Sequence, residues 1–499
     1  MKYNLIETGN IIDSIYELNN ITKDELEKKY DFNILDEVFL NFKDKLINDK
    51  DLKFLIVGDY DADGICATTI IKKLFNYLSI DSNYIIPSRI NQGYGLNKEI
   101  VKMAYENGFK ALLLLDNGIV CNKEIELAYS LGLKVYIIDH HEYQELPKAE
   151  AIIHSKIVSN TYQDLSAGGL SFVLSRTFYE DDLSTVLGGL STISDMMKVT
   201  GFNRYLIKEM MKLLETGNIY QMNYLNESKY YGFESLSFNV IPKINALSRM
   251  EPMGDPNKLV KYFLADEKTC RITIEQINYV NEQRKLNTKS MAKEAKELVD
   301  DKDIIVVCSR NFMEGLCGLI ANKLVHEISK PVIVLALKDG MYKGSGRSID
   351  CFNLYESLKD YQHYDSYGGH EGAIGLSFKE EDYQSFIDYI SSLDYKYEER
   401  SKDVLLIEDN SINLDLLDVL NKLKPFGEGL KEPLFAIKNN NYKKCIVSNR
   451  FAKYQIRNDL SAISFNESFK DKKADILIGT LKQDIYHKNS IQMLIEDLL

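Results

Sequence analysis

Three carboxylates alternate along a short stretch that follows an apolar run. The stretch is FLIVGDYDADGICATTI, residues 54–70, and the carboxylates are Asp59, Asp61 and Asp63. Taken singly, an aspartate after a strand is more often a helix N-cap or a turn residue than a ligand. Three together would repel one another and raise each other's pKa, so a bound cation is the economical explanation for the group.

Further carboxylates and two histidines follow other segments nearby in the sequence. Asp116 follows the run ALLLL, and Asp195 follows the helical stretch GLSTIS. The run VYII is followed by Asp139, His140 and His141. Carboxylate and imidazole ligands together suit Mn²⁺, Mg²⁺, Zn²⁺ or Fe²⁺, and this set exceeds what one ion needs. Two ions about 3.5–4 Å apart that share a carboxylate are the arrangement used for phosphoester cleavage.

A parallel sheet is the element that would bring these residues together. Short apolar runs at 54–57, 84–86, 111–115, 134–138 and 151–153 are mostly separated by segments of helical periodicity. Such a pattern is typical of an α/β domain whose parallel sheet is covered on both faces. The carboxyl ends of parallel strands meet at one rim, where ligands bind, so the charged residues are expected to converge there.

The pattern beyond this sheet predicts further domains. Residues 266–300 contain no Gly or Pro and are predicted to form one long helix. A second α/β pattern follows within residues 301–400. Within that pattern, KGSGRS (343–348) and YGGHEGAIG (367–375) are expected to be Gly-rich turns. Short strands with polar breaks indicate a small OB-like β-barrel at the end. The predicted segments are 1–49 (helical extension), 50–265 (catalytic domain), 266–300 (connecting helix), 301–400 (second α/β domain) and 401–499 (linker and barrel).

The composition is that of an ordinary globular protein. Of 499 residues, 45% are apolar and 27% charged, and no run of 18 apolar residues predicts a membrane span. The start, MKYNLIETGN, lacks the apolar core of a signal peptide. Seven scattered cysteines without a CxxC pair favour reducing conditions. We therefore expect a cytoplasmic protein without a membrane partner.

Net charge alone argues against a nucleic-acid binder, but its distribution does not. The chain carries −13, yet residues 421–460 contain nine Lys or Arg against three Asp or Glu. A basic surface with aromatic platforms is how OB-folds track single strands, although for any one aromatic the core is the better expectation. The interleaved aromatics are Phe426, Phe435, Tyr442, Phe451 and Tyr454.

The motifs resemble a known superfamily. VGDYDADG, LLLDNGI, IIDHH and STISD, in this order, resemble the four motifs of the DHH phosphoesterases, and KGSGRS and YGGHEGAIG resemble the associated DHHA1 domain. Three segments resemble RecJ-type single-strand-specific exonucleases, and GTLKQDIYHKNSIQMLIEDL is similar to the end of their OB domain. The three segments are PSRINQGYGLN (87–97), IPKINALSR (241–249) and LKPFGEGLKEP (423–433). The resemblance extends from about residue 50 to the end.

The resemblance implies a two-metal centre. Asp61 would bind one ion and Asp63 the other, with Asp116 bridging them. His141 would lie beside the scissile phosphate, and Asp139 would orient a neighbouring histidine. The implied metal ligands are Asp59, Asp61, Asp63, Asp116, His140 and Asp195, and the implied catalytic residues are His141, Asp139 and Asp61.

The resemblance also implies a strand-binding set. Arginines give bidentate phosphate contacts, and Gly-rich segments free backbone N–H groups for anions, although each Arg could instead be an ordinary surface or salt-bridge residue. The implied residues are Arg89, Arg249, Ser345, Arg347, Gly369 and His370. The chain departs from the family at three places: His154-Ser155 replaces Asn-Pro, Lys243 and Ser248 replace Arg and Gly, and FGEGLKEP lacks an Asn-Pro.

The predicted function is degradation of single-stranded DNA from the 5′ end to mononucleotides, in DNA repair or recombination. It would require two divalent ions, Mn²⁺ or alternatively Mg²⁺. The expected partners are single-stranded DNA, a single-strand-binding protein and a helicase, with the chain a monomer. Two alternatives stay open. The first is a DHH phosphodiesterase that acts on short oligoribonucleotides or cyclic dinucleotides, for which residues 430–499 would not be needed. The second is a non-catalytic scaffold that binds single strands, for which the complete set of metal ligands would not be needed.

Overall fold

The computed structural model is described for residues 2–30, 36–90, 93, 95–228, 230–393, 395, 401–439, 442–484, 487 and 489–499. Three residues of the predicted strand-binding segment, Asn91, Gln92 and Tyr94, lie outside this part of the chain. The chain divides into two compact units. The larger unit comprises Tyr30–Met197 and Tyr205–Glu398, and the smaller unit comprises Met1–Lys29, Lys198–Arg204 and Glu399–Leu499.

The larger unit contains the predicted parallel sheet. Its strands are β2 (Phe54–Val57), β3 (Ser82–Ile85), β4 (Ala111–Leu115), β5 (Lys134–Asp139) and β6 (Ala151–His154). They lie in the order β3-β2-β4-β5-β6, and all neighbours pair in parallel. Every residue of β2 and β4 is buried, as expected for strands that are covered on both faces.

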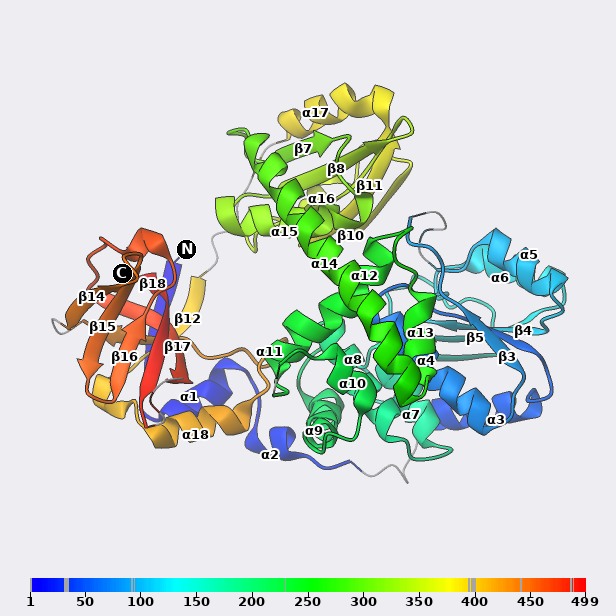
Figure 1. Ribbon diagram of the computed structural model, residues 1–499, viewed down its shortest axis with the longest axis horizontal. Coiled ribbons are helices and arrows are strands. Elements are labelled where there is room, and N and C mark those ends of the chain that lie inside the picture. The colour runs from blue at the N-terminus through cyan, green and yellow to red at the C-terminus, as the bar shows by residue number, and fades with distance from the viewer. Residues whose placement is uncertain are drawn as a thin grey trace. The chain divides into compact units, whose positions relative to one another are not determined.

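Helices cover both faces of this sheet (Figure 1). They are α3 (Glu37–Asn48), α4 (Ala62–Tyr77), α5 (Lys98–Glu106), α6 (Asn122–Ser130), α7 (Ala167–Arg176) and α8 (Asp182–Ser194). On one face, Ile100 of α5 and Ile125 of α6 share a core with Leu112 of β4. On the other face, the ring of Phe54 lies 5.2 Å from that of Phe75 on α4. The sheet is therefore held between two helical layers.

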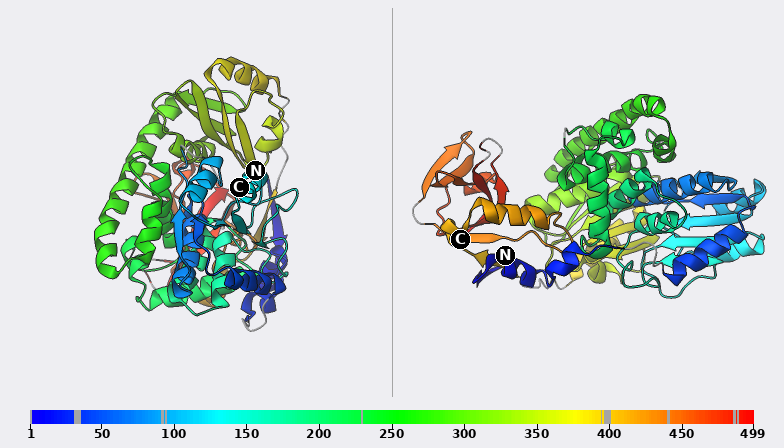
Figure 2. Two further views of the ribbon diagram at one scale, coloured as in Figure 1. Left: turned by 90° about the vertical axis from the view of Figure 1, so that its right-hand side faces the viewer. Right: turned by 90° about the horizontal axis from the view of Figure 1, so that it is seen from below.

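A helical region joins this sheet to a second one. Its helices are α9 (Gly201–Glu215), α10 (Tyr220–Leu225), α11 (Phe233–Ser235), α12 (Ile241–Arg249), α13 (Asn257–Leu264) and α14 (Glu267–Glu297). The long helix expected within 266–300 is α14, which has 31 residues (Figure 2). Its N-cap is Asp266, whose side chain accepts the N–H of Thr269 at 2.8 Å.

The second sheet of the larger unit has the order β10-β11-β9-β8-β7. Its strands are β7 (Ile305–Ser309), β8 (Val332–Lys338), β9 (Met341–Arg347), β10 (Ser366–His370) and β11 (Ala373–Lys379). β7 and β8 are parallel, and the other pairs are antiparallel. The helices of this α/β domain are α15 (Cys317–Ile328), α16 (Leu354–Leu358) and α17 (Tyr383–Ser392).

The expectation that the two Gly-rich segments are turns is wrong for KGSGRS, and in YGGHEGAIG it holds only for Glu371 and Gly372, which join β10 to β11. KGSGR lies in β9 and YGGH in β10, and both segments are paired with β11. A Cβ at Gly344 would lie 2.0 Å from the carbonyl oxygen of Val334, and one at Gly369 would lie 2.2 Å from that of Ala373. These glycines are needed because neighbouring strands approach closely, and not because the chain turns.

The smaller unit contains an eight-stranded sheet in the order β1-β12-β13-β17-β18-β16-β15-β14. The strands are β1 (Lys2–Glu7), β12 (Ser401–Leu406), β13 (Phe435–Lys438), β14 (Lys443–Val447), β15 (Phe451–Arg457), β16 (Leu460–Ile463), β17 (Ile476–Gln483) and β18 (Ile491–Leu498). The helices are α1 (Ile11–Leu18), α2 (Lys23–Glu27) and α18 (Leu414–Leu423). The six C-terminal strands match the short strands that the sequence predicts.

The expectation of a helical extension over 1–49 is wrong at its beginning. Residues 2–7 form β1, which pairs in parallel with β12 over six positions. Tyr3 and Leu5 pack on a core of Val404, Ala436 and Ile478, so burial in the sheet decides the local structure. α3, in contrast, belongs to the larger unit.

Arg204 joins the three chain segments of the smaller unit. Its buried guanidinium donates hydrogen bonds to four carbonyl oxygens, those of Leu26, Lys422, Lys424 and Pro425. Burial lowers the pKa of Arg204 to about 10. Because carbonyl groups at the end of α18 carry partial negative charge, the cation is well placed there.

Across the described ranges, no helix combines the length and apolarity that crossing a bilayer demands.

Deleting residues 1–8 should expose the edge of β12 in the intact chain. β12 pairs with β13 at only two positions, so its protection depends on β1. We expect amide hydrogen exchange in 401–404 to become at least ~10-fold faster, which corresponds to about 1.4 kcal/mol of local stability. Exchange in 54–57 of the larger unit is the internal control. Unchanged exchange in 401–404 would contradict the assignment of β1.

Candidate metal and phosphate site

The predicted ligands converge at the carboxyl ends of three neighbouring strands. β2, β4 and β5 lie side by side, and each is followed by charged residues. Asp59 lies two residues beyond β2, Asp116 directly follows β4, and Asp139 ends β5. Asp195 arrives from elsewhere, as the C-cap of α8. The convergence that the strand pattern predicts is therefore present.

Three groups of these residues have ligand atoms within 4.8 Å of one another. The groups are Asp59, Asp61 and Asp116; Asp63, His140 and Asp195; and Asp116, His140 and His141. Asp116 occurs in two groups and His140 in two, so the groups form one continuous centre. Asp116 has a φ of +61°, a left-handed conformation that Asp and Asn tolerate better than most residues.

Asp61 is both a helix cap and a member of the centre. One of its oxygens, Oδ1, accepts the N–H groups of Asp63 at 3.0 Å and Gly64 at 3.2 Å, at the N-terminus of α4. The cap interpretation and the ligand interpretation are therefore compatible, because a carboxylate has two oxygens. A Cβ at Gly64 would lie 2.6 Å from the backbone of Asp59, so this glycine lets α4 start directly against the Asp59 loop.

Backbone N–H groups at the start of α7 hold Asp63. Its two oxygens accept the N–H of Gly168 at 2.8 Å and that of Ala167 at 3.0 Å, and the Ser191 hydroxyl also donates to it. Burial raises the pKa of Asp63 above its ordinary value, and these hydrogen bonds oppose that rise. A Cβ at Gly168 would lie 2.3 Å from the Ser191 oxygen. Sequence reasoning missed these residues, although SAGG at 166–169 is a small-residue helix start.

His140 is directed into the middle of the carboxylates. Its Nε2 atom lies 3.2 Å from an oxygen of Asp116, 3.3 Å from one of Asp195 and 3.6 Å from one of Asp63. The atom is buried, and within the described chain it makes no hydrogen bond. Burial lowers the pKa of His140 below its ordinary value, which favours the neutral ring that binds metals.

The carboxylates of the centre are costly to ionise together. Burial, followed by the charge of neighbouring carboxylates, raises the pKa of Asp59 and Asp116 well above the ordinary value and that of Asp195 to about 8. The Oδ1 atom of Asp59 is buried and finds no hydrogen-bond donor among the described residues. A buried carboxylate oxygen and a buried imidazole nitrogen without such partners are donors that a divalent cation would satisfy.

Asp139 differs from the other carboxylates because hydrogen bonds occupy both of its oxygens. Oδ1 accepts Nδ1–H of His141 at 2.8 Å and the N–H of His140 at 2.7 Å, while Oδ2 accepts the N–H of Ile119 at 3.0 Å. Burial opposes ionisation of Asp139, but the hydrogen bond and charge of His141, together with the backbone N–H groups of Ile119 and His141, outweigh it and lower the pKa. For His141 burial is again outweighed by Asp139, which raises the pKa of the imidazole to about 9.

His154, one of the departures from the family pattern, supports the same loop. The ring is fully buried, and its Nδ1 atom accepts the N–H of Lys156 at 3.0 Å. Its Nε2 therefore carries the proton and donates to the carbonyl oxygen of His141 at 2.9 Å. The side chain of His154 thus helps to fix the backbone at His141.

Four guanidinium groups lie together beside this centre. Burial and three neighbouring guanidinium groups lower the pKa of Arg249 to about 9. These neighbours are Arg89, Arg347 and Arg284. Arg89 stacks on Tyr60, 4.8 Å from the ring centroid, and Tyr60 stands between two of the clustered aspartates. The sequence predicts three of the four arginines and misses Arg284, which α14 contributes.

The remaining predicted strand-binding residues lie on the second sheet. The register places Ser345 opposite Gly375 and Arg347 opposite Ala373, and Ala373 in turn pairs with His370. A Cβ at Gly318, near the start of α15, would lie 3.3 Å from Arg347 and 3.4 Å from Ser345. Gly369 and His370 are exposed, and within the described chain no hydrogen bond joins His370 to the arginines.

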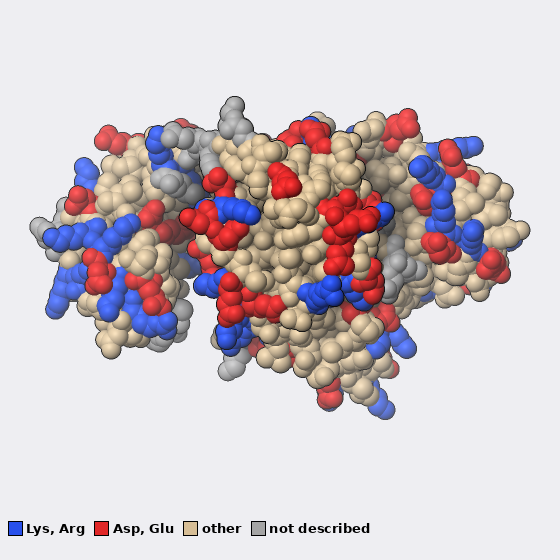
Figure 3. Space-filling model, turned by 90° about the horizontal axis from the view of Figure 1, so that it is seen from above, with Lys and Arg blue, Asp and Glu red and all other residues tan. Residues whose placement is uncertain are grey.

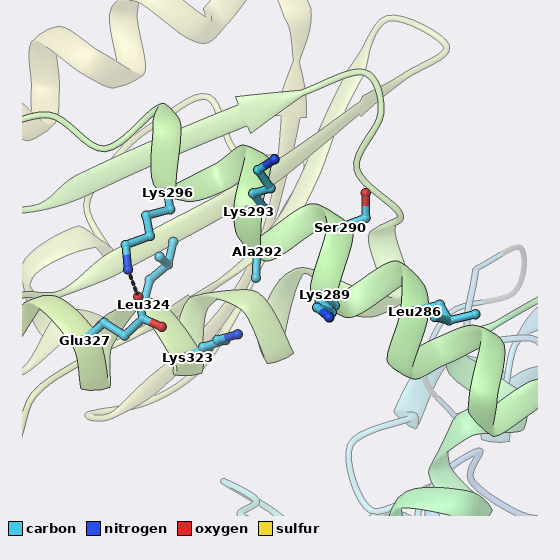
Figure 4. Close-up of a pocket in the computed structure, with 9 residues that line it drawn as sticks. All are labelled: Leu286, Lys289, Ser290, Ala292, Lys293, Lys296, Lys323, Leu324 and Glu327. Carbon is cyan, nitrogen blue, oxygen red and sulfur yellow. Dashed lines mark hydrogen bonds and ion pairs between the residues drawn. The ribbon is translucent and has the colours of Figure 1, made fainter. Parts of the chain in front are cut away.

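Two cavities adjoin these elements. One, of about 410 Å³, is lined by Ile90, Arg249 and Glu251, by residues 312–315, and by Ala336, Lys338, Asp339, Met341 and Lys343. The other, of about 500 Å³, lies between α14 and α15 and carries four lysines, of which Lys296 pairs with Glu327 at 2.8 Å (Figure 4). The second cavity shares no residue with the arginine cluster or the acidic centre.

The basic surface expected on the smaller unit is only partly available. Lys and Arg side chains gather on this unit in Figure 3. However, Phe435 and Tyr454 are buried in the core and cannot stack on a base. Arg457 donates to two backbone carbonyl oxygens of its own unit. Phe451 is partly accessible, and its ring lies 5.5 Å from that of the exposed Phe465, which the sequence reasoning missed.

Comparisons with known proteins agree with the fold. Family models match the DHH family, N-terminal domain, over 53–192, the DHHA1 domain over 300–393 and the RecJ OB domain over 405–497. The structure of RecJ with Mn²⁺ from Thermus thermophilus aligns with all of this chain and 79% of that one, with a TM-score of 0.87 and 19% identity. The fold class is thereby confirmed.

Two curated proteins named single-stranded-DNA-specific exonuclease RecJ are similar to this chain in sequence. The single-stranded-DNA-specific exonuclease RecJ of Bacillus subtilis (strain 168) is 30% identical over 462 residues, which are 83% of this chain and 56% of that protein. RecJ of Haemophilus influenzae is 27% identical over 77% of this chain and 74% of that protein. The chain thus spans between about half and three quarters of these relatives. Matches to the DHH, DHHA1 and RecJ OB models thus follow one another along this chain, and the similarity to RecJ-type proteins that the motifs predict is confirmed.

Proposed function

We propose that this chain is a metal-dependent exonuclease that degrades single-stranded DNA from the 5′ end to mononucleotides. One observation carries the proposal: a buried carboxylate and histidine centre, in which Asp116 belongs to two ligand groups, lies beside four clustered arginines. An acidic cation site next to a phosphate-binding surface suits phosphodiester hydrolysis. The names of the curated relatives support single-stranded DNA as the substrate.

The centre would hold two divalent cations. We assign Asp59 and Asp61 to one ion, Asp63, His140 and Asp195 to the other, and Asp116 to both. Bound cations would supply an activated water and neutralise the developing charge on the phosphate. Structures of RecJ from Thermus thermophilus have been solved with Mn²⁺ and with Mg²⁺. They support our proposal of Mn²⁺ as the cofactor, with Mg²⁺ as the alternative.

The protein groups position the reacting phosphate. Asp139 holds the Nδ1–H of His141 and so orients the ring, whose other nitrogen we assign to the scissile phosphate. Arg89, Arg249 and Arg347 would hold phosphates of the terminal nucleotides. The exposed backbone of Gly369, with Ser345 and His370, would guide the strand along the second sheet, and Arg284 would strengthen the positive field.

We also propose the limits of the domains, the partner proteins, the oligomeric state and the cellular location. The catalytic domain would span 50–265, the connecting helix 266–300 and the DHHA1 domain 301–400. The OB domain, 401–499 with β1 added, would hold the incoming strand. A single-strand-binding protein and a helicase are the proposed partners, and the proposed state is a cytoplasmic monomer.

A direct test uses the full-length chain with Mn²⁺ or Mg²⁺ and single strands labelled at either end. DNA and RNA strands are digested in parallel, and the products are sized. The proposal expects labelled mononucleotides from the 5′ end of DNA at the earliest times. Release from the 3′ end first would contradict the polarity. Short oligoribonucleotides and cyclic dinucleotides are tested in parallel, and cleavage restricted to them would favour the phosphodiesterase alternative.

Replacing Asp116 by Asn should abolish cleavage without unfolding the chain, since Asn also tolerates the positive φ at this position. Loss of a shared ligand should lower kcat by more than ~100-fold, or about 2.7 kcal/mol. Mn²⁺ bound per chain, measured by isothermal titration, should fall. Glu106→Gln, an exposed carboxylate at the end of α5, is the control. A variant that retains a tenth of the activity would show that Asp116 is not shared.

Replacing Arg347 by Ala should weaken strand binding and leave the metal centre intact. The residue belongs to the second sheet, and burial followed by the charge of Arg89 lowers the pKa of its guanidinium. Loss of one phosphate contact should raise KM about 10-fold and reduce the slope of log Kd against log salt by roughly 1. Arg347→Lys should recover part of the affinity. Normal strand binding with reduced metal content would contradict this assignment.

A further inference from the structure

Arg89 stands on a short irregular segment that follows β3. Residues 86–90 form no helix or strand, yet their backbone must be fixed if the Arg89 guanidinium is to meet a phosphate in one orientation. The guanidinium itself is held from one side by the ring of Tyr60. What fixes the backbone comes from residues some 160 positions later in the chain.

Glu251 binds this segment with both of its oxygens. Oε1 accepts the backbone N–H of Arg89 at 3.1 Å, and Oε2 accepts the hydroxyl group of Ser88. Glu251 follows Arg249, the last residue of α12, by two positions. One carboxylate thus connects the elements that carry two of the clustered arginines.

Asn257 fastens the beginning of the same segment. Its Oδ1 accepts the N–H of Ile86 at 2.8 Å, and its Nδ2 donates to the carbonyl oxygen of Ile86 at 3.1 Å. The amide therefore pairs with Ile86 as a neighbouring strand would. Glu251 lies in the turn that follows α12, and Asn257 is the first residue of α13. The connection between these two helices therefore holds the segment at two points.

The carboxylate of Glu251 does not neutralise the arginines that it organises. In the described part of the chain it makes no ion pair with the guanidinium group of Arg89 or Arg249, and its hydrogen bonds go to a backbone N–H and a hydroxyl group. Arg89 therefore keeps its guanidinium donors for an anion, and Arg249 uses one N–H group on the carbonyl oxygen of Gly315 and keeps the others. A carboxylate that bound them directly would compete with the phosphate.

We propose that Glu251 is a positioning residue that holds Arg89 in register with Arg249 for the phosphates of the strand. This inference rests on the proposed function, because it concerns the same phosphate-binding surface. The geometry of the side chain, and not its charge, performs the task. Preorganising the loop removes the cost of ordering it when the strand binds.

Two substitutions separate geometry from charge. Glu251→Gln removes the charge but keeps the reach, and its amide group can still accept from Arg89 N–H and bond Ser88. Glu251→Asp keeps the charge but is one methylene shorter. Asp339→Asn, a carboxylate on the same cavity wall, is the matched control.

Binding of a 5′-phosphorylated oligodeoxynucleotide is measured by fluorescence anisotropy with EDTA present, so that no strand is cleaved. We expect Glu251→Asp to raise Kd and KM ~10-fold, as for one lost hydrogen bond, with kcat changed less than about 2-fold. Glu251→Gln and Asp339→Asn should stay near wild type. In Glu251→Asp, exchange of the Arg89 amide should be at least ~10-fold faster, with metal content unchanged.

The outcomes distinguish the two proposals. If the wild-type chain neither binds nor cleaves single strands, the proposed function fails. If the wild type does both but Glu251→Asp binds equally well, the positioning role is wrong and the function stands. If Glu251→Gln is impaired as much as Glu251→Asp, the negative charge is needed as well as the length of the side chain, and the inference that geometry alone performs the task is overturned.

Discussion

The mutual repulsion of buried carboxylates at the carboxyl end of the parallel sheet is the constraint on which the rest of the structure depends. Burial and neighbouring charge raise the pKa of Asp59, Asp116 and Asp195. Such a cluster persists only if its neighbours compensate for it. The start of α7 supplies N–H groups to Asp63, the start of α4 supplies them to Asp61, and the glycines at 64 and 168 allow these helix ends to approach. The loops after β2, β4 and β5 are therefore shaped by charge as much as by packing.

The arginine cluster is the counterpart of that centre, and it is also built from groups that oppose one another. Burial, followed by the charges of Arg89, Arg347 and Arg284, lowers the pKa of Arg249. The two clusters meet where Arg89 lies on Tyr60, between the aspartates of the first motif. Each cluster is unfavourable alone, and each is complemented by one component of the proposed substrate complex: cations for the carboxylates and phosphates for the arginines. This complementarity explains why both are kept in one unit.

The strands, and the meeting of the acidic residues at their ends, were largely predictable from the sequence, because the spacing of apolar residues and the positions of the aspartates after them carry that information. Apolar runs gave β2 and β4 with their observed limits, and aspartates after strands had to converge once the sheet was parallel. What failed depends on tertiary contacts. The glycines of β9 and β10 serve close strand approach, which no local pattern reveals. β1 is a strand because β12 offers an edge. Arg284 and the N–H groups around Asp63 come from distant segments, and the burial of Phe435 and Tyr454 follows from the sheet and not from their neighbours.

The central claim is that the carboxylate centre holds two cations that share Asp116. Crystals of the full-length chain grown with Mn²⁺, and data collected on both sides of the manganese absorption edge, would locate the ions without any assumption about activity. The account predicts two anomalous peaks about 3.5–4 Å apart, with one oxygen or both oxygens of Asp116 between them. A single peak, or two peaks of which only one lies within coordination distance of Asp116, would contradict it.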